Sequence, residues 1–152
     1  MGTVVRINIV GTNNPKELAV MNLSYDTSDG ITHSTNIKFE FNSLWEFGRD
    51  TDSPAFDFLL LSVFVYNVDR LLNRNRHSDD GWTRDITIEG IPARNADAMN
   101  AAAALFERSI NFLTGDKWTF QFTPHQAWNY APYTDVYYNR DEFAKVALFS
   151  GG

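Results

Sequence analysis

The N-terminal third of the chain alternates apolar and polar residues with the two-residue period of half-buried β-strands. In the first stretch Val5, Ile7 and Ile9 fall on one face, and the turn-forming residues 11–15 follow. A later stretch places Ile37 and two phenylalanines on one face in the same way. The pattern predicts a meander of three strands, at residues 3–10, 19–25 and 36–41.

The middle of the chain contains a long segment suited to an α-helix. Ser53 can accept a hydrogen bond from a free backbone N–H, and Pro54 at the first helical position loses no hydrogen bond. We expect this helix to extend to Leu72. Its centre, residues 58–65, is apolar on nearly all sides, which predicts a buried central helix, although such a run is also compatible with a buried strand.

A second helix is expected after Asn95, whose side chain suits an N-terminal cap, and it should end near Leu113, just before Gly115. Strands are expected on either side of it, at residues 83–88 and 118–122. This order of elements predicts an α+β fold, with a mainly antiparallel sheet covered by two main helices at residues 54–72 and 96–113.

The last part of the chain has a different character. Residues 124–140 show no clear period but are rich in tryptophan and tyrosine. Loops longer than about a dozen residues are usually functional or bound to a partner, so this segment is interpreted as a linker that packs on a neighbouring domain. The short apolar strand at residues 145–149 then leads directly into two glycines. We therefore expect an N-terminal accessory domain at residues 1–123, an aromatic linker at 124–143, and the first strand of a truncated α/β domain at 144–152.

Composition limits the classes of protein to consider. The chain has 152 residues, of which 43% are hydrophobic and 21% charged, and this suits one globular core. Cysteine is absent, which excludes disulfides, a cysteine nucleophile and a cysteine-ligated metal within these residues and agrees with a cytoplasmic location. The longest apolar run is far shorter than the roughly 20 residues of a membrane helix, so no membrane partner is expected.

The charge pattern argues against nucleic acid as a partner. The net charge is −6, whereas affinity for phosphate backbones depends on basic side chains. Several arginines do lie close together between residues 70 and 94, but aspartates and a glutamate are interleaved with them. A solvated, salt-bridged surface is the favoured interpretation.

Residues Ser150, Gly151 and Gly152, at the end of an apolar strand, have the form of a phosphate-binding loop. Glycines let backbone N–H groups converge on phosphate oxygens, and a following helix adds its positive N-terminus. Residues 145–152 resemble the opening of the SGGxDS signature of PP-loop ATP pyrophosphatases, the family of 7-cyano-7-deazaguanine synthase. Three earlier segments resemble the N-terminal region of the QueC-like proteins of bacterial anti-phage defence systems of the Qat type, at residues 65–70, 80–86 and 112–118.

The resemblance covers about residues 58–152 and implies adenylation chemistry. A PP-loop holds ATP, with Mg²⁺, while a carboxylate is activated, pyrophosphate is released and a nucleophile then displaces AMP. The resemblance implies Ser150, Gly151 and Gly152 as ATP-phosphate contacts of an incomplete loop, and no catalytic residue or cofactor for this chain alone. The rest of the ATP site and the family's cysteine zinc site would lie beyond Gly152. The implied partners are that PP-loop domain and other proteins of the same defence system.

Other candidate residues are fewer and less specific. Trp82 with Arg84 is a candidate contact for a partner or a flat substrate ring, and equally a strand-start pair packed on the core; Arg70 is a third candidate. The aspartate pair before Gly81 is expected to form a turn rather than to hold a cation.

The three histidines, His33, His77 and His125, are isolated in the sequence. None has a second histidine or a carboxylate at metal-ligand spacing, so surface or core histidines are favoured and no metal site is expected.

Taken together, these patterns predict an N-terminal domain that positions a substrate or partner for a QueC-like ATP-dependent enzyme and that is inactive alone. Two alternatives stay open. The chain is otherwise a stand-alone protein-binding module, or a ubiquitin-like modifier that presents its C-terminal diglycine for activation. The long second helix and the QueC-like segments count against the modifier.

Overall fold

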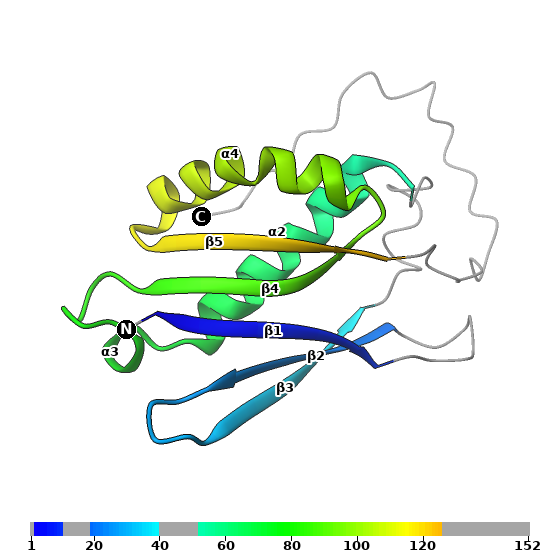
Figure 1. The fold of residues 1–152 in the computed structure, drawn as a ribbon. Coiled ribbons are helices and arrows are strands. Elements are labelled where there is room, and N and C mark those ends of the chain that lie inside the picture. The colour runs from blue at the N-terminus through cyan, green and yellow to red at the C-terminus, as the bar shows by residue number, and fades with distance from the viewer. Residues whose placement is uncertain (1, 11–18, 40–51, 126–152) are drawn as a thin grey trace, which may run out of the picture.

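The computed structural model describes residues 2–10, 19–39 and 52–125 (Figure 1). The strands and helices expected at residues 3–10, 19–25, 54–72 and 96–113 are confirmed to within two residues, whereas the third strand begins earlier than expected, at Thr32. The elements are β1 (Thr3–Val10), β2 (Ala19–Asp26), β3 (Thr32–Phe39), α2 (Pro54–Leu71), α3 (Arg74–His77), β4 (Asp85–Ala93), α4 (Ala96–Thr114) and β5 (Lys117–Pro124).

Most of the predicted linker and the whole of the predicted C-terminal strand lie outside the described residues, which end at His125. The same holds for Ser150, Gly151 and Gly152. The division at residue 123 and the truncated second domain therefore stay predictions.

The five strands form one sheet in the order β3-β2-β1-β4-β5. The pairs β1–β2 and β2–β3 are antiparallel, but β1–β4 and β4–β5 are parallel. The α+β class is confirmed, while the sheet is mixed rather than mainly antiparallel. The physical reason is the placement of the helices: α4 returns the chain to the end of the sheet where β4 began, so β5 must run parallel to β4.

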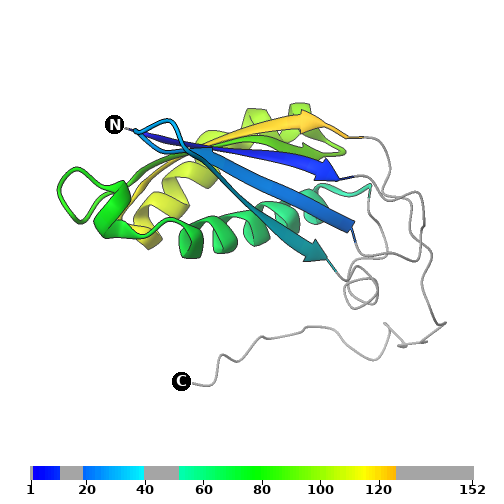
Figure 2. The same cartoon turned by 90° about the horizontal axis from the view of Figure 1, so that it is seen from below.

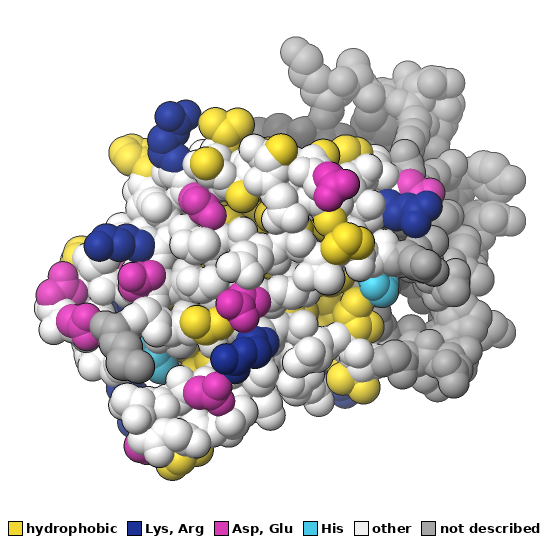
Figure 3. Space-filling view, in the orientation of Figure 1, with side chains coloured by type: hydrophobic (Ala, Val, Ile, Leu, Met, Phe, Trp, Pro, Cys, Tyr) yellow, Lys and Arg dark blue, Asp and Glu magenta, His cyan; other side chains and the backbone are white. Residues whose placement is uncertain are grey.

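The two long helices occupy different positions relative to the sheet. In Figures 1 and 2, α2 crosses one face of the sheet, whereas α4 runs alongside the outer strand β5. The core lies under α2, where Leu60, Phe64 and Val68 pack against the inward residues of the strands. The opposite face, seen in Figure 3, carries mostly polar side chains and backbone. Among the described residues this face of the sheet has no covering layer.

The expectation that α2 is buried on nearly all sides is wrong. Phe58 is 50% exposed and Tyr66 is 59% exposed, while Leu60 and Phe64 are fully buried. A helix that lies across one face of a sheet buries only the side turned to that sheet, and here the other side stays open among the described residues. None of the described helices is long and apolar enough to cross a membrane.

Side chains of α4 take the place of a further strand at the outer edge of β5. The backbone N–H of Trp118 donates to Asn111 Oδ1 at 2.8 Å, and that of Phe120 donates to Glu107 Oε1 at 3.0 Å. The N–H of Phe122 donates to the amide oxygen of Asn100 at 2.9 Å. These N–H groups belong to alternate residues and so point to the same edge, and the three acceptors share one face of the helix. The edge is thereby closed to other strands.

The two helix starts depart from the expected caps. Ser53 stands at the N-cap of α2 without a side-chain cap hydrogen bond, although Pro54 is the first helical residue as expected. Asn95 is the N-cap of α4, but its side chain donates to Asp57 instead of accepting. The fully buried Asp57 carboxylate, from α2, also accepts the backbone N–H groups of residues 94 and 95 at 2.9 Å each. A side chain of one helix therefore secures the start of the other. Gly115 ends α4 in the left-handed conformation, as predicted.

Candidate functional site

The candidate contact Arg84 is a structural residue. Its side chain is 1% exposed and forms ion pairs with Asp116 and Asp69. It also donates to the backbone carbonyls of Asp69 and Leu72. Of the two interpretations of Arg84, the structure supports the strand-start residue packed on the core, because the N–H groups of its guanidinium are bonded to acceptors of the protein itself.

Asp116 is the centre of this buried network. Its side chain is fully buried and accepts two hydrogen bonds from the Arg74 guanidinium, at 2.9 Å each, besides those from Arg84. Burial opposes ionisation of Asp116, yet its pKa is lowered because the hydrogen bonds and positive charges of the two arginines outweigh burial. Burial likewise opposes the charge on Arg84, but hydrogen bonds to Asp116 and Asp69 raise its pKa. Both groups are therefore charged at neutral pH.

The network fixes the loop that carries Trp82. Arg74 Nη1 donates to the Trp82 carbonyl at 2.8 Å, and Nη2 donates to the Thr114 carbonyl at 3.0 Å. Asp80 Oδ1 accepts the N–H groups of Trp82 and Thr83 at 2.8 and 2.7 Å, so the expected turn at this aspartate pair is confirmed. One guanidinium thus ties the Trp82 loop to the end of α4.

Three large apolar side chains are exposed at this end of the molecule. Trp82 is 72% exposed, Phe112 is 88% exposed and Leu113 is 78% exposed. Figure 1 shows the loop before β4 and the turn after α4 at the same end of the sheet. We call Trp82, Phe112 and Leu113 the end patch.

The third candidate, Arg70, lies elsewhere on α2. It is exposed, and its Nη1 donates to the Tyr66 hydroxyl at 2.7 Å while the guanidinium stands 5.5 Å from the centre of the Tyr66 ring. No described interaction joins Arg70 to Trp82 or Arg84. The structure therefore keeps Trp82 and Arg70 as separate surface residues and removes Arg84 from the surface.

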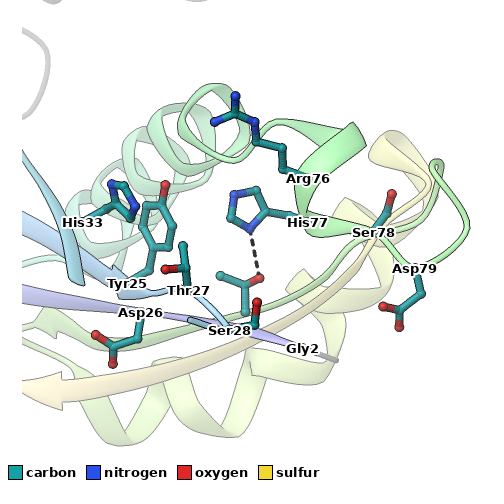
Figure 4. Close-up of a pocket in the computed structure, with 11 residues that line it drawn as sticks. Gly2, Tyr25, Asp26, Thr27, Ser28, His33, Arg76, His77, Ser78 and Asp79 are labelled. Atoms are coloured by element: carbon teal, nitrogen blue, oxygen red, sulfur yellow. Dashed lines mark hydrogen bonds between the residues drawn. The ribbon is translucent and has the colours of Figure 1, made fainter. Parts of the chain in front are cut away.

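A cavity of about 390 Å³ opens beside the β2–β3 hairpin (Figure 4). It is lined by the start of β1, the hairpin turn, and α3 with the residues after it. Tyr25 is its central ring: the His33 ring stacks on it at 5.3 Å between centroids, and the His77 ring meets it edge-on at 5.3 Å. His77 Nδ1 lies 3.4 Å from the Thr3 hydroxyl, the hydrogen bond drawn in Figure 4.

The structure brings together histidines that the sequence presents as isolated. Tyr25 pairs with His33 directly across the β2–β3 ladder, and α3 brings His77 to the same ring. The sequence showed neither contact, because the third strand was expected to begin only at residue 36 and α3 was not expected. Burial lowers the pKa of His77, and the charges of Arg84, Arg76 and His33 lower it further. His77 is therefore a neutral imidazole at neutral pH.

The third histidine, His125, directly follows β5. Burial lowers the pKa of His125, whose backbone N–H donates to the Ala93 carbonyl at 2.9 Å. Within residues 2–10, 19–39 and 52–125, no group of three or more histidine, aspartate and glutamate side chains is arranged to hold a metal ion.

The candidate functional features of the described residues are the buried ion network around Asp116, the end patch, and the cavity beside Tyr25. Neither a protein-family model nor a curated protein nor a solved structure matches this chain.

Proposed function

We propose that this chain is the N-terminal substrate- or partner-positioning domain of a QueC-like, ATP-dependent PP-loop enzyme of cytoplasmic anti-phage defence, and that it has no catalytic activity alone. The enzyme class rests on the resemblance of residues 145–152. The positioning role is supported by the end patch, three exposed apolar side chains on a loop and a helix end that the Arg74 guanidinium ties together.

The end patch has the properties of a protein-binding surface. Tryptophan is among the residues that contribute most to binding energy in interfaces. Because Arg74 already fixes the backbone of Trp82 and Thr114, little loop entropy is lost when a partner binds. The buried network therefore supports binding indirectly, by holding the patch in one shape.

We assign the end patch to the PP-loop domain implied by the resemblance of residues 145–152. A domain on the same polypeptide meets the patch at a high effective concentration, so a small apolar surface is sufficient for docking. In this arrangement Ser150, Gly151 and Gly152 contact ATP phosphates, with Mg²⁺, in the complete loop. Arg70 and its partner Tyr66 remain a second candidate contact, on α2.

The gene and the enzyme it encodes test the proposal. We expect the coding sequence to continue after Gly152 with the x-Asp-Ser half of the loop signature, and the encoded protein to catalyse exchange of pyrophosphate into ATP in the presence of a carboxylate substrate. Replacing Trp82→Ala together with Leu113→Ala should reduce this exchange at least tenfold.

Leu105→Ala is the matched control. Leu105 is 58% exposed on the same helix, α4, but lies outside the end patch, so this variant should exchange like the parent. A stop codon directly after Gly152 would contradict the proposal and favour the stand-alone module or the diglycine modifier. Equal loss in all variants would show that the end patch has no special role.

A further inference from the structure

The cavity beside Tyr25 has donor groups that the protein itself does not use. Arg76 lines it, is exposed, and forms no ion pair with an acidic side chain of the described residues. Ser28 lines the opposite side with no described side-chain hydrogen bond. When the Thr3 hydroxyl donates to His77 Nδ1, the neutral imidazole carries its proton on Nε2 and presents a further N–H.

Three polar side chains of the wall, Asp26, Thr27 and Ser78, are already engaged within the protein. Asp26 is ion-paired with Arg6 at 2.8 Å and accepts the Thr32 hydroxyl at 2.7 Å. The Thr27 hydroxyl donates within its own turn, and the Ser78 hydroxyl donates to the Arg74 carbonyl. In Figure 4 the carboxylates of Asp26 and Asp79 point away from the His77 ring. The cavity therefore offers unused donors and positive charge around His77.

We infer that this cavity binds a small molecule through its phosphate group, with Arg76 and the His77 imidazole as the donors. Arginine matches the oxygens of phosphate with paired N–H groups, and a tetrahedral anion accepts from several directions at once. The volume of about 390 Å³ exceeds the space of a phosphate group alone and lies in the range of small-molecule sites. The rest of the ligand would occupy the part of the cavity lined by Gly2 and Ser28.

Other ligand classes fit the cavity less well. A metal cation would meet Arg76 and would have no set of three ligating side chains within the described residues. A flat ring stacked on Tyr25 would compete with His33, which already covers one face of that ring, and with His77 at its side. An anion is the ligand whose binding groups are unoccupied.

The test is a titration of the whole chain, followed by ¹H–¹⁵N correlation spectra and calorimetry, with inorganic phosphate, phenyl phosphate and sodium chloride as probes. We expect shifts of the amide signals of residues 25–28 and 76–79 with either phosphate and none with chloride at equal ionic strength. Tighter binding of phenyl phosphate would identify a phosphate monoester, and tighter binding of inorganic phosphate would identify the free ion.

Arg76→Gln and Arg70→Gln form the matched pair of variants, because both arginines are exposed and only Arg76 lines the cavity. We expect Arg76→Gln to weaken phosphate binding at least tenfold and Arg70→Gln to leave it within twofold. Equal weakening by both, or no shifts of the cavity amides at 20 mM phosphate, would overturn the inference. The end patch and the PP-loop assignment play no part in this test, so its outcome is independent of the proposed function.

Discussion

A single buried carboxylate, Asp116, is ion-paired with two arginines, the buried Arg84 and the partly exposed Arg74. It accepts from the side chains of Arg74 and Arg84 and also from the Arg84 backbone N–H at 2.9 Å. Charges this deep are tolerated only when each hydrogen-bonding direction is met, because the interior does not solvate them. Arg84 therefore depends on Asp116 for its place in the fold.

Removing that charge should be costly. We expect Asp116→Asn to lower the free energy of unfolding by about 3–5 kcal/mol, since it leaves the buried Arg84 without its main counter-charge. Urea unfolding at pH 7 measures this. Asp69→Asn is the comparison, because Asp69 binds the same arginine from a side chain that is 44% exposed, and its loss should matter less. Equal effects of the two variants would contradict the central role of Asp116.

The titration of His77 gives the second prediction at this scale. Its pKa is lowered in the free protein by burial and by Arg84, Arg76 and His33, with Asp26 and Asp79 as the acidic residues of the same wall. A bound anion stabilises the protonated form of the imidazole and so raises the pKa of His77. Binding therefore takes up a proton, and the affinity for the anion should increase as the pH falls from 8 to 6. Sulfate is the suitable probe because its own charge does not change in this range.

The control for that prediction is His77→Gln, which keeps a hydrogen-bonding side chain but cannot be protonated. We expect it to flatten the dependence of sulfate affinity on pH, as measured by calorimetry at matched ionic strength. An unchanged slope would contradict proton uptake by His77.

Among the elements, α4 has a task besides covering apolar residues. Only two of its residues, Ala96 and Met99, are buried, whereas three polar side chains bind the outer edge of β5. An unprotected edge strand exposes a row of N–H groups to which another chain can add. The helix therefore acts as a lateral closure of the sheet.

The closure can be removed by shortening its three side chains. We expect Asn100→Ala, Glu107→Ala and Asn111→Ala combined to cost about 1 kcal/mol for each lost hydrogen bond and to make the protein self-associate through β5. Sedimentation velocity measures the association. Glu107→Gln, which keeps an acceptor oxygen, should remain like the parent; a triple variant that stays monomeric and equally stable would refute the closure.

At the scale of the whole molecule, local signals predicted the elements but not their arrangement. The two-residue period located β1, and Pro54 and Gly115 located helix ends, because each of these signals acts within a few residues. Whether two strands pair in parallel depends on the end of the sheet to which the connecting helix brings the chain back. No pattern within a few residues shows this. The sheet was therefore expected to be mainly antiparallel.

The site was less predictable for the same reason. Arg84 is buried because Asp116 and Asp69 meet it from 32 and 15 residues away, so its neighbours in sequence gave no sign of its partners. His77 reaches Tyr25 only through the placement of α3. Trp82, for which the sequence left a surface contact and a core position equally open, is exposed, and its role as a contact stays a prediction.

The position of β1 in the sheet affects how the protein emerges from the ribosome. Its antiparallel neighbour β2 follows within a few residues, but its parallel neighbour β4 is made much later, since Thr3 pairs with Ile86. At 5–20 residues per second, one side of β1 would wait roughly 4–17 s for its partner during synthesis. Throughout that interval the nascent meander offers an open edge in what becomes the middle of the sheet, and this is the stage at which a chaperone would protect it from aggregation.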